Sequence, residues 1–169
     1  NWMKLADGAQ HSIKTLTHEF LFKQNAMPPE VFDVFEQKHN SNELVDFMRV
    51  WSSENGIPKD EIEAELILQH DHFVRLNEAL DGKDWLVDNM FTLADIAWIP
   101  NVRRLDLLHY PLDIHPNLNA WYKRFQAKPS YIKGISEFEI PPALADFNVY
   151  SLERAEEGTG VRSFKPLAA

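Results

Sequence analysis

The sequence predicts an all-α protein, a helical bundle, and three observations support this prediction. Strict alternation of apolar and polar residues, which strands would show, is nearly absent. Proline and glycine stand where helices begin and end. Apolar residues recur three or four positions apart, first in the stripe Trp2, Leu5, Ala9, Ile13, Leu16 and Phe20.

The amino-terminal half predicts three helices. The first stripe spans about five turns of helix and ends at Met27-Pro28-Pro29, because proline has no backbone donor and disfavours helix in the residue before it. A short helix is expected over 30–38. A further helix has Leu44, Phe47, Met48 and Trp51 on one face and ends near Asn55-Gly56.

Four more helices are predicted after Pro58. The next begins there, with acidic residues in its first turn that complement the helix dipole, and closes at Asp81-Gly82. The others begin near Thr92, after His115-Pro116 and at Pro129. The composition becomes loop-like after Pro141-Pro142. We therefore expect a helical domain over 1–136 and an extended or flexible tail over 137–169.

Composition excludes several functional classes. The chain has 169 residues, which suits one domain, and no cysteine, so it holds no disulfide framework, iron–sulfur site or cysteine nucleophile. Its formal net charge of −9 disfavours nucleic acid and anionic membranes as partners. No apolar run approaches the roughly 18 residues of a membrane span, and the amino end lacks a signal-peptide layout, so a cytoplasmic location is expected.

The segment Phe91-Thr92-Leu93-Ala94-Asp95-Ile96 carries two helix-start signals. With Thr92 as N-cap, its hydroxyl can accept from the backbone N–H of Asp95 while the Asp95 carboxylate accepts from the N–H of Thr92, which is an aspartate form of the capping box. Phe91 and Ile96 are spaced for a hydrophobic staple. Loss of the Thr92 cap alone should lower the free energy of unfolding by about 1 kcal/mol. Pro100 should kink the helix that follows.

The surroundings of this segment resemble a known family. The order of a leucine-striped helix, then "DWLVDNMFTLADIA" and then "HPNLNAWYKRFQAKPSYIKGI", resembles the carboxyl-terminal helical domain of cytosolic glutathione transferases. The resemblance covers most of residues 2–135 and is most specific over 80–135. The stretch "GIPKDEIEAEL" looks closer to bacterial transferases of the aryl-ether-cleaving type.

The resemblance implies a function and a missing partner domain. Such proteins use glutathione as co-substrate, act on a hydrophobic electrophile and form homodimers. Their thioredoxin-like domain carries the residue that stabilises the glutathione thiolate, and nothing in this chain looks like it. We expect that domain upstream of Asn1, so the catalytic residue is not among these residues and a fragment without that domain should be inactive. The alternative is a non-catalytic interaction module with the same helical fold.

Candidate site residues lie on two of the predicted helices. Asp7, His11, Lys14 and His18 are spaced four, three and four apart and form a polar stripe, for which a solvated face is the alternative interpretation. The resemblance places His11, Lys14 and Thr15 at the substrate, and Asp7 at the glutathione amine of a neighbouring subunit. No His-x-x-x-His pair is present, so no metal site is predicted.

On the helix that follows Thr92, the resemblance places Trp98, Asn101 and Arg104 at the substrate cleft. A core position is the alternative for Trp98. Arg103 and Arg104 could bind an anionic substrate, whereas pairing with Asp106 is the plainer alternative.

Overall fold

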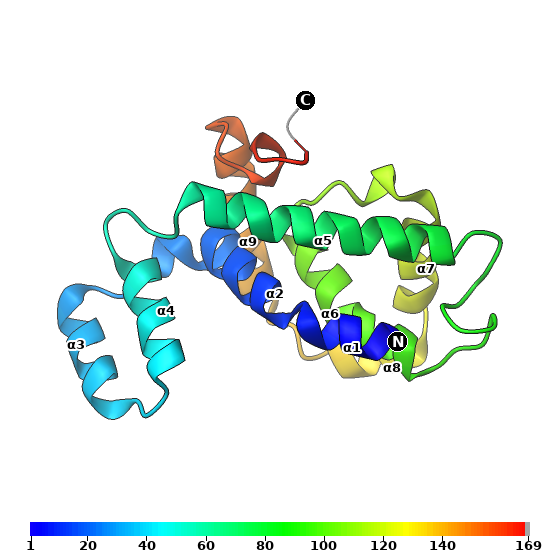
Figure 1. The fold of residues 1–169 in the computed structure, drawn as a ribbon, viewed down its shortest axis with the longest axis horizontal. Helices are drawn as coiled ribbons and strands as arrows, with labels where there is room; N and C mark the ends of the chain where they lie inside the picture. Colours follow the sequence, from blue (N-terminus) through cyan, green and yellow to red (C-terminus); the bar gives the residue numbers. More distant parts are fainter. Residues whose placement is uncertain (168–169) are drawn as a thin grey trace.

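The computed structural model describes residues 1–167, and helices connected by turns and loops make up that range without a strand (Figure 1). The helices are α1 (Trp2–Gly8), α2 (Gln10–Thr17), α3 (Pro29–Lys38), α4 (Asn42–Ser52), α5 (Lys59–Ala79), α6 (Leu93–Leu107), α7 (Pro116–Gln126), α8 (Pro129–Tyr131) and α9 (Pro141–Glu156). The described residues also contain two π-helical turns, η1 (His18–Phe22) and η4 (Ile132–Ser136). Three short 3₁₀ turns are η2 (Lys23–Asn25), η3 (Leu112–Ile114) and η5 (Val161–Ser163). The predicted all-α class is confirmed.

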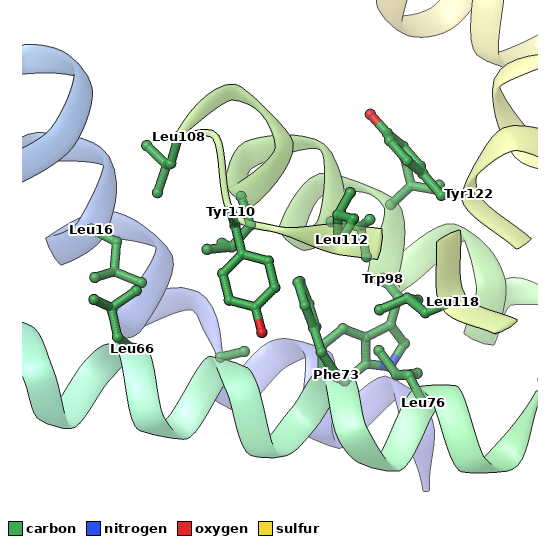
Figure 2. Packing of buried hydrophobic residues seen from close by; sticks show 14 of the residues in the cluster. Leu16, Leu66, Phe73, Leu76, Trp98, Leu108, Tyr110, Leu112, Leu118 and Tyr122 are labelled. Carbon is green, nitrogen blue, oxygen red and sulfur yellow. The ribbon is translucent and has the colours of Figure 1, made fainter. Parts of the chain in front are cut away.

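Helix α5 organises the core. It packs against α2 on one side and α7 on the other, and α6 lies against α1 and α2 (Figure 1). The side chains of Leu66, Phe73 and Leu76 on α5 are fully buried. They face Leu16 of α2 and Trp98 of α6 in the same cluster (Figure 2). Burying side chains of this size stabilises the fold by about 2 kcal/mol each.

The predicted first helix forms as consecutive pieces. Helices α1 and α2 meet at Ala9, which keeps right-handed helical geometry, and η1 continues α2. Ala6, Ala9, Leu16 and Phe20 are buried, as the apolar stripe requires. Trp2, Leu5 and Ile13 pack only at the edge of the core.

Helices α3 and α4 pack on each other and form a hairpin that projects from one end of the molecule (Figure 1). No residue of α3 is buried. Helix α4 contributes Val45, Met48 and Trp51 to the buried set. The hairpin is therefore attached to the bundle through α4.

Helix α6 begins where the capping box predicts. Thr92 is its N-cap, the reciprocal box with Asp95 is present, and the helix continues through Pro100. The predicted staple does not form in the expected way, because Ile96 is 48% exposed. Phe91 packs edge-on against Trp85 and Phe125 instead, at ring distances of 4.9 and 5.5 Å.

The expectation of an extended tail is corrected over 141–156, which form helix α9. Pro141 and Pro142 occupy the first turn of this helix. Proline is tolerated there because the backbone N–H groups of a first turn make no hydrogen bond within the helix. Arg154 holds α9 to the bundle. Its guanidinium lies 2.8 Å from the Glu19 carboxylate and donates to the Glu19 carbonyl at 2.6 Å.

None of the helices in residues 1–167 combines the length and apolarity that crossing a bilayer requires.

Candidate functional site

A buried carboxylate fixes the start of α6. One oxygen of Asp95 accepts from the Leu86 backbone N–H and from the Trp121 indole N–H, both at 3.0 Å. The other oxygen accepts from the Thr92 backbone N–H at 2.9 Å. The Thr92 hydroxyl in turn accepts from the Ala94 N–H at 3.2 Å. Because Asp95 is completely buried, these donors replace water around its charge and hold the helix in one position.

The outer side of α6 and the start of α1 form an apolar face. Leu93 and Ile96 share one side of α6 and are 64% and 48% exposed, and Met3 of α1 is 46% exposed. Met3 and Ala97 also line a groove of about 490 Å³ between α1 and α6, together with Asp7. The predicted glutathione contact Asp7 is thus exposed and lies next to an uncovered apolar surface.

A second group of residues surrounds His18 on the C-terminal end of the first helical segment. The His18 ring lies edge-on to Phe47 and Trp51, each at 4.9 Å, and to Phe22 at 5.6 Å. Its Nδ1 lies 2.8 Å from the Lys14 carbonyl oxygen. Since a carbonyl only accepts, Nδ1 carries the proton, and Nε2 of the neutral ring is an acceptor.

Lys14 lies beside the same ring cluster. Its ammonium group is 4.4 Å from the centroid of Phe47, a cation–π distance. It also lies 3.7 Å from the Glu43 carboxylate, whose side chain is 84% exposed. A pair exposed to this degree contributes little binding energy.

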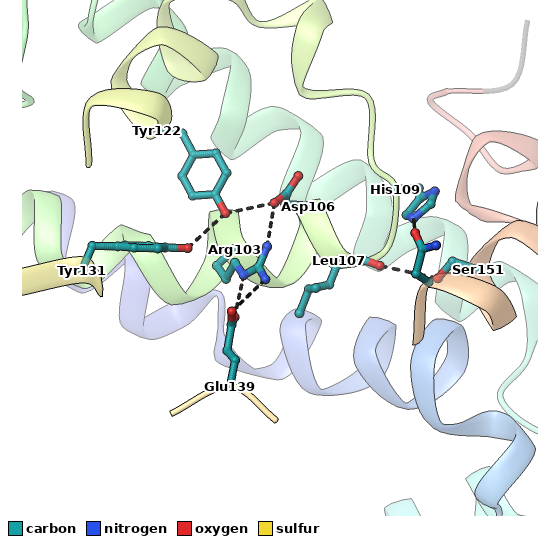
Figure 3. Close-up of polar contacts among 9 residues, drawn as sticks. Arg103, Asp106, Leu107, His109, Tyr122, Tyr131, Glu139 and Ser151 are labelled. Carbon is teal, nitrogen blue, oxygen red and sulfur yellow. Dashed lines mark hydrogen bonds and ion pairs between the residues drawn. The ribbon is translucent and has the colours of Figure 1, made fainter. Parts of the chain in front are cut away.

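The neighbouring arginines of α6 differ in their partners. Arg103 donates to both oxygens of Glu139, at 2.7 and 3.0 Å, and to Asp106 at 2.9 Å (Figure 3). The Asp106 carboxylate also accepts from the Tyr122 hydroxyl at 3.0 Å. Within residues 1–167, no carboxylate lies within 4 Å of the Arg104 guanidinium. The predicted pairing with Asp106 therefore holds for Arg103 and not for Arg104.

Arg104 is partly buried on α6. Burial lowers the pKa of the Arg104 guanidinium, and the charge of Arg103 lowers it further. Burial is also the main cause that lowers the pKa of His18, to which the charges of Lys14 and Arg104 add. Of the residues predicted to contact substrate, Lys14 lies beside this ring cluster.

Other predicted residues lie elsewhere. His11 is exposed, with its Nε2 3.5 Å from the Glu65 carboxylate. Thr15, Trp98 and Asn101 are core residues with no exposed surface, and for Trp98 this agrees with the alternative interpretation as a core position. The Trp98 indole donates to the Trp2 carbonyl at 3.1 Å, and Asn101 donates to the Ala97 carbonyl at 3.5 Å.

Sequence reasoning missed two polar groups. The Tyr110 hydroxyl lies between two imidazoles, 2.8 Å from His70 and 2.9 Å from His115, which come from separate elements. The other is the buried pair of Arg154 and Glu19. The His70–Tyr110 and Arg154–Glu19 contacts join residues 40 and 135 positions apart, so no local motif marks them.

Comparison with known proteins gives a partial match. Residues 59–124 match the family model described as "Glutathione S-transferase, C-terminal domain". A 54-residue stretch is 35% identical to glutathione S-transferase D6 of Drosophila melanogaster, covering 32% of this chain and 25% of that protein. The matched stretch thus spans about a quarter of the relative's length. No solved structure matches this chain.

The matched region contains α5, the Thr92–Asp95 capping box and most of α7. Its all-α packing agrees with that match. Residues 59–124 of this chain are therefore similar to the glutathione S-transferase C-terminal domain.

Proposed function

We propose that this chain is the substrate-binding helical domain of a glutathione transferase. In this proposal glutathione is the co-substrate, and its thiolate attacks the electrophilic carbon of a hydrophobic compound. The bacterial aryl-ether-cleaving subtype is the finer assignment that the stretch 56–66 favours. The similarity to the C-terminal domain family over residues 59–124 supports the proposal.

One observation carries the proposal beyond similarity, namely the uncovered apolar face of Met3, Leu93 and Ile96 beside the Asp7 groove. Exposed large apolar side chains at the starts of two packed helices are what a face that packs on another domain or protein would present. A thioredoxin-like domain packed on this face would bring bound glutathione to the ends of α1 and α6. Asp7 would then lie within reach of the amine of glutathione, from the same or a neighbouring subunit.

In this proposal the helices hold the electrophile in place, and they do not supply the nucleophile. The aromatic side chains Phe22, Phe47 and Trp51 offer an apolar wall for the electrophile, as small-molecule sites typically do. Holding electrophile and thiolate together makes the attack effectively intramolecular. The Asp95 network keeps α6 fixed while the substrate binds. A homodimer in the cytoplasm is part of the proposal.

The test uses the intact protein. Glutathione and a panel of electrophiles that includes chlorodinitrobenzene and aryl ethers are supplied, and the glutathione conjugate is measured by absorbance and mass spectrometry. We expect enzyme-dependent conjugate with at least one of them. Absence of conjugate across the panel would favour the non-catalytic interaction module.

A further inference from the structure

A hollow between η2 and α9 shares no residue with the Asp7 groove. Its volume is about 430 Å³, and Gln24 and Asn25 of η2 line one side of it. The other side is formed by residues of α9 between Ala143 and Glu153. Small-molecule sites have volumes of about 300–1,000 Å³, so this hollow is large enough to hold a small ligand.

The α9 wall of the hollow carries a carboxylate at each end. Asp146, Val149, Tyr150 and Glu153 stand at positions i, i+3, i+4 and i+7, and therefore share one side of the helix. Asp146 and Glu153 are thus about 10 Å apart along the helix axis. This separation favours two positive charges spaced along the helix over one ion shared by both carboxylates.

The surface between the two carboxylates is apolar. Val149 is 53% exposed and lines the hollow. Phe147 also lines it, and its ring packs on the ring of Phe22 at 5.4 Å. A hydrocarbon chain laid along these side chains would remove apolar surface from water. On the opposite wall, the amide oxygens of Gln24 and Asn25 can accept hydrogen bonds from an ammonium group.

The charge of the hollow is negative, since no basic residue of 1–167 lines it. Lys23 of η2 donates instead to a backbone carbonyl of α4, at 2.7 Å. Arg154 lies 5.9 Å from the Tyr150 ring, but its charge is taken up by its buried ion pair. Asp146 and Glu153 are exposed and form no ion pair within 4 Å in the described part of the chain.

We propose that this hollow binds a linear organic diammonium compound, with one ammonium at Asp146 and the other at Glu153. Its hydrocarbon chain lies along Phe147 and Val149. An exposed ion pair contributes at most about fivefold in affinity, so the two pairs and the chain must act together. No bond forms or breaks in this site. The inference therefore goes beyond the proposed function and does not depend on it.

The test measures binding of 1,7-diaminoheptane to the intact protein by isothermal titration calorimetry at low ionic strength, where ion pairs are least screened. In its extended form, the two nitrogens are about as far apart as the two carboxylate residues. The compound 1-aminoheptane keeps the chain with one charge, and 1,3-diaminopropane keeps both charges on a short chain. We expect 1,7-diaminoheptane to bind about fivefold more tightly than either.

Two variants remove one carboxylate each. Asp146→Asn and Glu153→Gln should each lower the affinity for 1,7-diaminoheptane by about fivefold and abolish its advantage over 1-aminoheptane. Glu78→Gln is the matched control, because it removes the same charge from an exposed position on α5. It should leave all three affinities unchanged. This control separates binding in the hollow from general attraction of amines to a chain of net charge −9.

A further variant tests the apolar strip. Val149→Asn should weaken binding of 1,7-diaminoheptane and of 1-aminoheptane, and leave that of 1,3-diaminopropane unchanged. Thermal unfolding shows that each variant is folded. The inference is overturned if 1,7-diaminoheptane binds no more tightly than 1-aminoheptane, or if Glu78→Gln weakens binding as much as Asp146→Asn and Glu153→Gln do. Absence of binding at millimolar concentration would overturn it as well.

Discussion

The indole N–H of Trp121 in α7 donates to the Asp95 carboxylate at the start of α6, at 3.0 Å. The same oxygen accepts from Leu86 in the preceding loop, so one buried group joins three segments of the chain. The carboxylate of the local capping box thus also makes tertiary hydrogen bonds to the preceding loop and to α7.

Replacing Asp95 should destabilise the fold far more than loss of a surface cap. Asp95→Ala leaves the Leu86, Thr92 and Trp121 donors without acceptors in the core, and we expect a loss of about 4 kcal/mol in the free energy of unfolding. Urea denaturation measures it, and the melting temperature should fall by about 10 °C.

Asp81→Ala, at an exposed position near the end of α5, is the control and should change stability by less than about 0.5 kcal/mol. Trp121→Phe removes only one donor and should cost about 1 kcal/mol. Equal free energies of unfolding for Asp95→Ala and Asp81→Ala would show that the hydrogen bonds of Asp95 contribute nothing to stability.

The Arg154–Glu19 pair should decide whether the carboxyl-terminal helix stays docked. Both side chains are about nine-tenths buried, and Arg154→Met leaves the Glu19 carboxylate without its cation. We expect a loss of about 3 kcal/mol. Limited proteolysis should then cut between 137 and 167 earlier than in the parent.

The matched control for that variant is Arg162→Met, an exposed arginine of η5, which should leave the cleavage rate unchanged. Cleavage of the Arg154 variant at the parent's rate would mean that α9 is held by its apolar contacts alone.

Stability should fall as pH drops below neutral because of His115. Burial, with a smaller contribution from the charge of His70, lowers the pKa of His115 to about 4. Between pH 6.5 and 4 the unfolded chain therefore binds a proton that the folded protein does not. The contribution of His115 is present above the unfolded pKa and is lost as pH falls through this window, by up to about 3 kcal/mol.

Unfolding free energies at pH 7 and pH 5 measure this effect. His115→Gln should show a smaller decrease between the two values than the parent. The same decrease in both proteins would assign the pH dependence to other groups, such as His18 and His72, whose pKa values burial also lowers.

The sequence predicted what depends on short-range chemistry. The Thr92–Asp95 box is a pattern within four consecutive residues, and its geometry follows from helix starts in general. The bonds from Trp121 and Leu86 that complete it come from 26 and 9 residues away, so no local rule could reveal them.

The errors have identifiable causes. The expectation of an extended tail after Pro141-Pro142 is wrong over 141–156, because proline is compatible with the first turn of a helix as well as with a loop. The resemblance places Thr15 and Asn101 at the substrate, and their complete burial between packed helices depends on tertiary packing that a resemblance in sequence does not reveal.

The most direct measurement concerns the apolar face of α6. In the intact protein, Leu93→Asp combined with Ile96→Asp should prevent a second domain from packing there. The control is Val31→Asp combined with Val34→Asp, an exposed apolar pair on α3. We predict that kcat/KM for glutathione conjugation falls by about tenfold or more in the first variant, with unchanged melting temperature, and stays at the parent's value in the second. Equal kcat/KM in both variants would contradict the account.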